Sequence, residues 1–175
     1  PPERKSPYDD DTIKFCLIGQ PNVGKSTLSN AIIGEERTIV SNVPGTTRDA
    51  IDTMFTRNGN KYVVIDTAGI RKQGKIYENA EKYSVLRALS AIERSDICIL
   101  VIDGTQDVNE QDKRIAGYAR DDNKAIIIVV NKWDIVDKDD KTMQKMTEKI
   151  KTQMPFIDFA PIIFLSAKNQ SRVNK

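Results

Sequence analysis

The sequence predicts an α/β fold built on a doubly wound, mainly parallel sheet of six strands, one of which runs antiparallel. Two observations support this prediction. Short apolar runs alternate along the chain with longer segments of helical periodicity, which is the order of βαβ units with right-handed crossovers. In addition, Asn58-Gly59 separates two strand-like runs, and this dipeptide favours a tight hairpin that reverses one strand.

The elements follow in order from changes in the residue pattern. Strands are expected where short runs are apolar or β-branched, at 13–18, 49–56, 62–65, 97–102, 125–130 and 161–165. Helices are expected at 25–33, 78–94, 109–120 and 139–153. The run at 125–130, Ala-Ile-Ile-Ile-Val-Val, is continuously apolar, as is typical of a strand covered on both faces. The charged run at 137–141 is interpreted as the solvated start of the last of these helices.

Composition limits the possible classes of protein. The 175 residues fit one domain, and a formal net charge of +2 gives little non-specific attraction to nucleic acid. Any RNA contact would therefore come from a local patch or from another domain. Cys16 and Cys98 lie in apolar runs without metal-ligand spacing, so buried, reduced thiols are expected. The sequence contains no signal peptide and no apolar stretch long enough to span a bilayer, which favours a cytoplasmic location.

A phosphate-binding loop follows the first expected strand. Residues 19–26 read Gly-Gln-Pro-Asn-Val-Gly-Lys-Ser, the pattern G-x-x-x-x-G-K-S. Such a loop binds polyphosphate through inward-pointing backbone N–H groups, and glycines permit the close approach. Lys25 is expected to reach the β- and γ-phosphates, Ser26 to offer its hydroxyl to Mg²⁺, and the next helix to direct its positive end at the phosphates. The nucleotide-binding residues predicted here are Gly19, Asn22, Val23, Gly24, Lys25, Ser26 and Thr27.

A second motif indicates which base is bound. Asn131-Lys132-Trp133-Asp134 has the form N-K-x-D and follows the apolar run at 125–130. The Asp134 carboxylate can accept hydrogen bonds from guanine N1–H and N2–H₂, whereas adenine offers no such pair of donors; an unpaired carboxylate would cost about 1–3 kcal/mol or more. Ser166-Ala167-Lys168 follows the last expected strand, and its Ala167 N–H could donate to guanine O6.

These segments resemble the Ras-like translation-factor class of GTPases. The residues that carry the resemblance are 19–27, 44–49 (Pro-Gly-Thr-Thr-Arg-Asp), 66–72 (Asp-Thr-Ala-Gly-Ile-Arg-Lys), 131–134 and 166–168, which together span almost the whole chain. Within this class the chain is similar to the bacterial ribosome-assembly GTPases with two successive GTPase domains, and residues 81–89 resemble the second of the two. The resemblance implies a P-loop GTPase fold that binds GTP or GDP with Mg²⁺.

The reaction centre is expected around Asp66-Thr67-Ala68-Gly69. Asp66 follows an apolar run, so it can hold Mg²⁺ through water at a strand end, while the Gly69 N–H can meet the γ-phosphate. Thr47 is the candidate for the second hydroxyl ligand of Mg²⁺; Thr46 is its rival by chemistry, and the family pattern Pro-Gly-x-Thr favours Thr47. The predicted metal ligands are Ser26, Thr47, Asp66 and, for K⁺, Asn22.

One departure from the class concerns the attacking water. Ras-like enzymes commonly have glutamine after the glycine, where this sequence has Ile70, whose hydrocarbon side chain cannot hydrogen-bond water. Another positive charge must then stabilise the transition state. The resemblance implies a K⁺ ion held by Asn22, although this side chain could instead stabilise a turn. The residues predicted to act in catalysis are Asn22, Lys25, Thr47 and Gly69.

Both ends of the sequence are expected to continue into other parts of a longer protein. Residues 1–11 are Pro-rich, charged and aperiodic, which is typical of an interdomain linker. Residues 12–175 would form the GTPase domain, ending inside its last helix. The resemblance implies a preceding GTPase domain, a following KH-like domain and the large ribosomal subunit as partner, with no membrane contact.

The predicted function is a GTP-hydrolysing switch in the assembly of the large ribosomal subunit. The hydrolytic part rests on the residues, whereas the ribosomal part rests on the resemblance. The alternative is a binding module that depends on guanine nucleotide and has negligible turnover, which the presence of Ile70 would fit.

Overall fold

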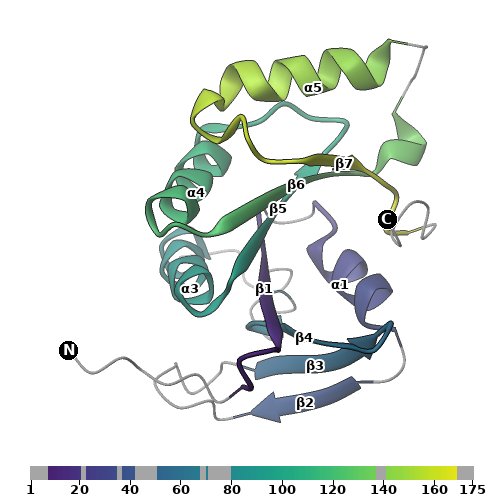
Figure 1. Ribbon diagram of the computed structural model, residues 1–175. Helices are drawn as coiled ribbons and strands as arrows, with labels where there is room; N and C mark the ends of the chain where they lie inside the picture. Colours follow the sequence, from purple (N-terminus) through teal and green to yellow (C-terminus); the bar gives the residue numbers. More distant parts are fainter. Residues whose placement is uncertain are drawn as a thin grey trace.

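The computed structural model describes residues 8–20, 23–34, 37–41, 51–67, 70, 80–136 and 141–168, with only the backbone described for residues 40, 41 and 80–84. Its centre is a sheet of seven strands in the order β2-β3-β4-β1-β5-β6-β7 (Figure 1). In chain order these are β1 (Ile13–Ile18), β2 (Arg37–Ser41), β3 (Ile51–Arg57), β4 (Asn60–Val64), β5 (Ile97–Asp103), β6 (Ala125–Asn131) and β7 (Ile162–Phe164). The pairs β4–β1, β1–β5, β5–β6 and β6–β7 are parallel, whereas β3 runs antiparallel to both β2 and β4. The predicted fold class, with one antiparallel strand, is confirmed.

The prediction of six strands was one too few within the described residues. The strand that it missed is β2, which pairs with β3 in the register Arg37↔Phe55 to Ser41↔Ile51. Ile39, in the middle of β2, is 56% exposed. Because β2 lies at the edge of the sheet, this strand is recognisable mainly by its pairing with β3.

The hairpin between β3 and β4 matches the prediction. Asn58 and Gly59 both have positive φ, 54° and 80°, as a two-residue turn of the primed type requires. Arg57 and Asn60 are the last pair before the turn. The local sequence therefore determines where β3 reverses.

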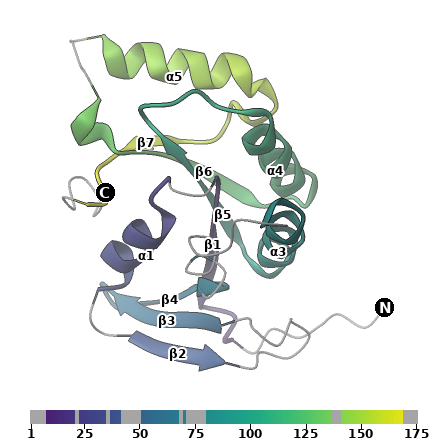
Figure 2. The ribbon, with the colours of Figure 1, turned by 180° about the vertical axis from the view of Figure 1, so that it is seen from behind.

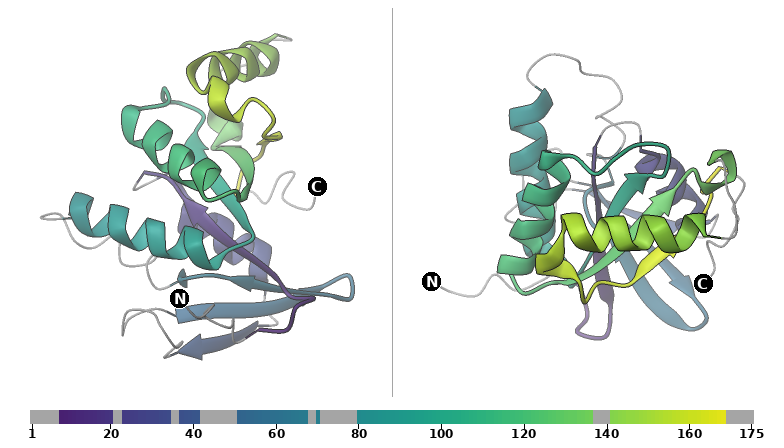
Figure 3. Two further views of the ribbon diagram at one scale, coloured as in Figure 1. Left: turned by 60° about the vertical axis from the view of Figure 1, so that its left-hand side comes forward. Right: turned by 90° about the horizontal axis from the view of Figure 1, so that it is seen from above.

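Helices cover both faces of the sheet. They are α1 (Lys25–Ile33), α3 (Ala80–Arg94), α4 (Glu110–Asp121) and α5 (Thr142–Gln153), with short 3₁₀ turns at η1 (Trp133–Ile135) and η2 (Pro155–Ile157). In Figures 1 and 2, α1 lies on the face opposite α3 and α4, and α3 and α4 lie side by side in Figure 3. None of the described helices combines the length and the apolar character needed to cross a membrane.

Two apolar clusters correspond to these two faces. The larger contains side chains of α3, α4 and α5, and the smaller contains Leu28 and Ile33 of α1. Cys16 and Cys98 are paired in register on β1 and β5, and both are fully buried and free. The expectation of buried, unbridged thiols is confirmed.

The strand order determines where a ligand can bind. β1 lies between β4 and β5, and the chain leaves β1 toward α1 on one face but leaves β4 toward α3 on the other. In open α/β sheets, ligands bind outside the carboxyl ends of the strands at such a switch point. The phosphate loop begins directly after β1, so the topology places it there.

Burial in the sheet should control stability. Leu100 on β5 is fully buried, whereas Leu86 on α3 is 64% exposed. Leu100→Ala is expected to lower the free energy of unfolding by about 2–5 kcal/mol because it leaves a cavity, while the matched Leu86→Ala should change it by less than about 0.5 kcal/mol. Urea unfolding without nucleotide measures both; equal losses would contradict the described core.

Candidate nucleotide-binding site

The carboxyl edge of the parallel strands gathers most of the predicted site. Four strands end at or just before a predicted residue: Gly19 after β1, Asp66 after β4, Asn131 in β6 and Ser166 after β7. The strand between β1 and β6, β5, ends at Asp103, which was not predicted. The separate motifs of the sequence are therefore brought to one side of the sheet.

The two glycines of the phosphate loop are required by backbone geometry. Gly19 has φ +145°, and a Cβ there would lie 2.5 Å from the Val101 carbonyl oxygen. Gly24 has φ +96°, and its Cβ would lie 2.2 Å from Asn131 Nδ2. Both distances are too short for a side chain. The loop thus passes close to β5 and β6 only because these residues are glycine.

Lys25 begins α1 and is buried, with 6% of its surface exposed. Its Nζ donates to the Gly19 carbonyl oxygen at 2.5 Å. Burial lowers the pKa of Lys25 to about 8, and the negative charge of Asp112 on α4 opposes this shift. The ammonium group therefore remains mainly protonated at pH 7. The side chains of Ser26 and Thr27 are exposed beside it, and Val23 is buried.

Asn131 joins three parts of the site. Its Nδ2 donates to the Val23 carbonyl oxygen in the phosphate loop at 2.9 Å. Its Oδ1 accepts the Ala167 N–H at 3.0 Å, and the residue itself is 3% exposed. The side-chain amide of the N-K-x-D motif thus holds the phosphate loop against the Ser-Ala-Lys motif.

The other three residues of the N-K-x-D motif differ in burial. Lys132 has φ 60°, and its Nζ forms an ion pair with Asp103 Oδ2 at 2.9 Å. Burial alone would raise the pKa of Asp103, but hydrogen bonds from Thr105 and Lys132 together lower it. Trp133 is buried against Phe164, with ring centroids 4.6 Å apart, whereas the side chain of Asp134 is exposed. The predicted guanine-binding carboxylate therefore faces solvent.

The Ser-Ala-Lys motif follows β7 with Ser166 and Ala167 buried and Lys168 exposed. The Ala167 N–H already has an acceptor in Asn131 Oδ1. A hydrogen bond from the same group to guanine O6 would have to share or replace this contact. That contact with the base stays a prediction.

Asp66 is held at both its backbone and its side chain. It has φ 54°, and its N–H donates to Asp52 Oδ1 on β3 at 2.9 Å. Both carboxylate oxygens accept hydrogen bonds from Arg87 on α3, at 2.7 and 2.8 Å. Oxygen donors such as Ser26 and Asp66 suit Mg²⁺, but a metal at Asp66 would compete with Arg87. Metal binding by Asp66 stays a prediction.

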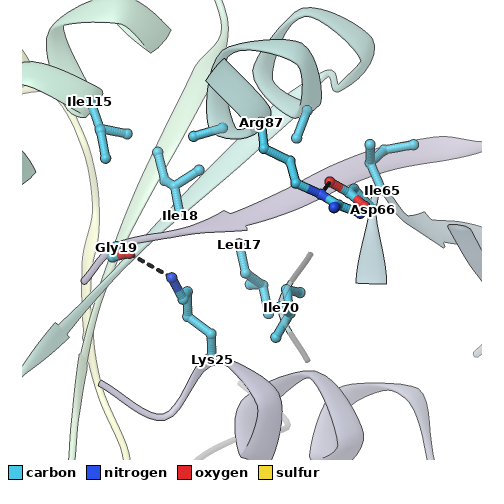
Figure 4. Close-up of a pocket in the computed structure, with 11 residues that line it drawn as sticks. Leu17, Ile18, Gly19, Lys25, Ile65, Asp66, Ile70, Arg87 and Ile115 are labelled. Atoms are coloured by element: carbon cyan, nitrogen blue, oxygen red, sulfur yellow. Dashed lines mark hydrogen bonds and ion pairs between the residues drawn. The ribbon is translucent and has the colours of Figure 1, made fainter. Parts of the chain in front are cut away.

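A pocket lies between these groups. Gly19, Lys25, Asp66, Ile70 and Arg87 line it together. Figure 4 shows Lys25 directed at Gly19 and Arg87 directed at Asp66. The Ile70 side chain packs against the apolar cluster that contains Leu17 and Leu28, so it supplies hydrocarbon to this pocket.

Several predicted site residues lie outside the described part of the chain. These are Asn22, Thr47 and Gly69. Residues 1–7 of the expected linker and residues 169–175 also lie outside the described part. Their roles stay predictions. Sequence reasoning missed Asp52, Arg87 and Asp103. Asp103 ends an apolar run as Asp66 does, so its position was a usable signal, whereas the other two are identified only by their contacts.

The fold and the loop geometry define a P-loop nucleotide-binding protein, and comparison identifies its class. Residues 14–132 match the family described as 50S ribosome-binding GTPase, and the chain belongs to this family. It is homologous over nearly its whole length to a GTPase domain of GTPase Der. It is 61% identical to GTPase Der of Bacillus cytotoxicus over 172 residues (98% of this chain) and 61% identical to that of Geobacillus thermodenitrificans over 175 residues.

The chain spans only 39–40% of the length of these two relatives. Among solved structures, it is similar to Era in complex with MgGDPNP and a segment of 16S ribosomal RNA. The identity is 25% and the TM-score 0.70, covering 94% of this chain and 54% of Era. A structure of Aquifex aeolicus Era bound to GDP and AlF₄⁻ gives a TM-score of 0.69 at the same identity. Both agree with the P-loop GTPase fold.

Gly24 offers a direct test of the loop geometry. Gly24→Ala should lower the free energy of unfolding by at least about 1–2 kcal/mol because of its positive φ, and GDP affinity should fall about tenfold as Asn131 is displaced. Gly117→Ala is the matched control. Gly117 lies in α4 with open space around its Cα, so alanine there should raise stability by about 0.5–1 kcal/mol. Calorimetry and urea unfolding measure both variants. Unchanged GDP binding in Gly24→Ala would rule out the close approach to Asn131.

Proposed function

We propose that the chain is a switch domain that binds GTP, hydrolyses it to GDP and phosphate, and acts in assembly of the large ribosomal subunit. One observation carries the proposal most directly. Asn131 joins the phosphate loop to the Ser-Ala-Lys motif, while Asp134 is left exposed beside them. The segments proposed to bind phosphate and guanine thereby lie together at the carboxyl ends of the strands, as a guanine nucleotide would require.

The roles proposed for the site residues follow from their chemistry. Asp134 would accept the two guanine donors, and Lys132, held by Asp103, would line the base site with Lys168. Lys25 would exchange its contact with the Gly19 carbonyl for phosphate oxygens, which are stronger acceptors for an ammonium group. The exposed side chains of Ser26 and Thr27 stand at the start of α1, where backbone N–H groups favour phosphate.

Mg²⁺ is the proposed metal, with Ser26, Asp66 and Thr47 as the residues that would hold it. When bound, it would neutralise charge that develops on the phosphates. Arg87 would have to release at least one oxygen of Asp66 for this to happen, since it contacts both in this structure. The Gly69 N–H would contact the γ-phosphate.

Hydrolysis requires positive charge beside the β- and γ-phosphates. Lys25 supplies one such charge, and we propose that a K⁺ ion bound through Asn22 supplies a second. This is consistent with Ile70, whose side chain packs into an apolar cluster and can neither donate to nor accept from water. The alternative, a binding module without appreciable turnover, would need no second charge.

The ribosomal role is supported by the description of the family, 50S ribosome-binding GTPase. We propose that the chain corresponds to the second GTPase domain of a GTPase Der protein, because residues 81–89 resemble that domain. In the whole protein it would follow another GTPase domain and precede a KH-like domain, in the cytoplasm. RNA contact would then come through the ribosome or through those other domains.

The experiment that tests this function uses the whole protein. Release of phosphate from GTP is measured with and without purified large ribosomal subunits, with Lys25→Ala as the inactive control. Turnover that depends on Lys25 and changes with the subunit supports the switch. Tight GTP binding without phosphate release in either condition would support the binding module instead.

Base specificity should rest on Asp134. Asp134→Asn is expected to lower GTP affinity at least about tenfold, because the amide cannot accept both guanine donors, and to favour xanthosine triphosphate, whose position 2 is a carbonyl. Asp121→Asn is the matched control. Asp121 is exposed at the end of α4, just before β6 begins, and so lies at the amino ends of the parallel strands, away from the nucleotide site. Competition binding with the two nucleotides measures the preference. An Asp134→Asn variant with the wild-type margin for GTP would exclude this assignment.

The proposed K⁺ site predicts a dependence on the monovalent cation. GTP hydrolysis should be faster in K⁺ than in Na⁺ by about tenfold for each 1.4 kcal/mol of transition-state stabilisation, and Asn22→Ala should remove the difference. The comparison is made at matched ionic strength and saturating GTP. Equal rates in the two salts would rule out the K⁺ mechanism but would not contradict guanine-nucleotide binding.

A further inference from the structure

Asp52 is a fully buried carboxylate on β3 outside the predicted motifs. Its Oδ2 accepts hydrogen bonds from the Tyr8 hydroxyl and from Arg94 Nη2. Its Oδ1 accepts the Asp66 N–H at 2.9 Å. One side chain thus contacts the segment before β1, the end of α3 and the turn after β4.

These contacts are needed for the carboxylate to be buried at all. Removing a charged group from water costs several kcal/mol unless it is paired and its oxygens are hydrogen-bonded. Arg94 supplies the opposite charge, and its side chain is itself only 18% exposed. Burial, followed by the hydrogen bond to Asp52, raises the pKa of Tyr8, so its hydroxyl stays protonated and donates. The ion pair with Arg94 and the hydrogen bond from Tyr8 therefore hold the Asp52 carboxylate in one position.

The contact with Asp66 stabilises a backbone shape that the residue disfavours. Asp66 has φ 54°, in the left-handed region that costs an L-residue roughly 1–2 kcal/mol. The hydrogen bond from its N–H to Asp52 orients this turn from the backbone, while Arg87 holds the side chain.

Arg87 and Arg94 lie seven residues apart on α3, close to two helical turns, so they project from one face of the helix. That face binds both aspartates.

We propose that Asp52 is a positioning residue for Asp66, and that the Tyr8 hydroxyl couples the segment before β1 to the orientation of the Asp66 turn. A change in how that segment docks is thereby transmitted through one carboxylate to the nucleotide site. Asp52 lines no part of the described pocket, so it would act on the site through Asp66 and not by contact with the nucleotide. It applies to the free protein as well, and therefore goes beyond the proposed function.

The test uses Tyr8→Phe, which deletes one oxygen from a half-buried side chain, in the whole protein. Tyr118→Phe is the matched control, since Tyr118 is 37% exposed on α4. Hydrogen exchange of the Asp66 amide is followed by NMR without nucleotide. Tyr8→Phe is expected to speed this exchange about fivefold, the equivalent of one net hydrogen bond, and Tyr118→Phe to leave it unchanged.

Asp52→Asn completes a double-mutant cycle with Tyr8→Phe. The amide keeps an acceptor for the Asp66 N–H but loses the charge that Arg94 and Tyr8 recognise, so the two changes should be strongly non-additive in Asp66 exchange. If Asp52→Asn does not fold, Tyr8→Phe alone decides the question. Unchanged Asp66 exchange in Tyr8→Phe, with only a lower melting temperature, would mean that Tyr8 is a structural anchor and would overturn the proposal.

A second measurement separates this inference from the proposed function. The measured quantity is the Mg²⁺ concentration at which half of the protein still has GDP bound. If Asp66 holds the metal, this concentration is expected to rise about threefold to tenfold in Tyr8→Phe but not in Tyr118→Phe. Faster Asp66 exchange with an unchanged Mg²⁺ midpoint would support the coupling and count against Asp66 as a metal ligand. Unchanged exchange overturns the coupling, whatever the Mg²⁺ midpoint does.

Discussion

The side-chain amide of Asn131 is the constraint on which the arrangement of the nucleotide site depends. It ends β6, is almost fully buried, and uses one donor and one acceptor on two different loops. Loss of either contact would leave a buried carbonyl or N–H unpaired, which costs about 1–3 kcal/mol. The same side chain explains why residue 24 must be glycine, because Nδ2 occupies the space of a Cβ there. The packing and hydrogen bonds of Asn131 and the backbone conformation of residue 24 thus all require glycine at that position.

A second set of polar contacts lies beside Asp66 and Arg87, which line the pocket together with Gly19 and Lys25 of the phosphate loop. Here the sheet itself supplies the acids, Asp52 from β3 and Asp66 after β4, while α3 supplies the bases. Such pairs contribute little net stability, since desolvation offsets much of the attraction. Their effect is geometric: they require α3 to lie where both arginines reach their carboxylates. The position of α3 beside the pocket therefore depends on the ion pairs that Asp52 and Asp66 form with its two arginines.

How much of this was predictable from the sequence depends on whether the cause is local. The Asn58-Gly59 turn and the G-x-x-x-x-G-K-S loop are specified by neighbouring residues, so their positions could be read directly from the chain. The edge strand β2 was missed because Ile39 is exposed. The contacts of Asn131, and those of Asp52 with Tyr8 and Arg94, join residues 36 to 108 positions apart. Only the strand order brings those partners together, and a single sequence does not reveal it.

Asp66 forms an ion pair with Arg87, and the proposed binding of a cation to the same carboxylate would compete with that ion pair. A ligand changes a conformational equilibrium only to the extent that it binds the alternatives differently. Arg87 occupies both Asp66 oxygens in the described arrangement, so any cation that needs one of them binds more weakly here than where Arg87 has withdrawn. The cation would then favour a displaced α3, and displacement would also strain the Arg94–Asp52 pair on the same helix face. Since Asp52 contacts both the Asp66 N–H and Arg94 of α3, the proposed coupling would make α3 and the turn after β4 respond together.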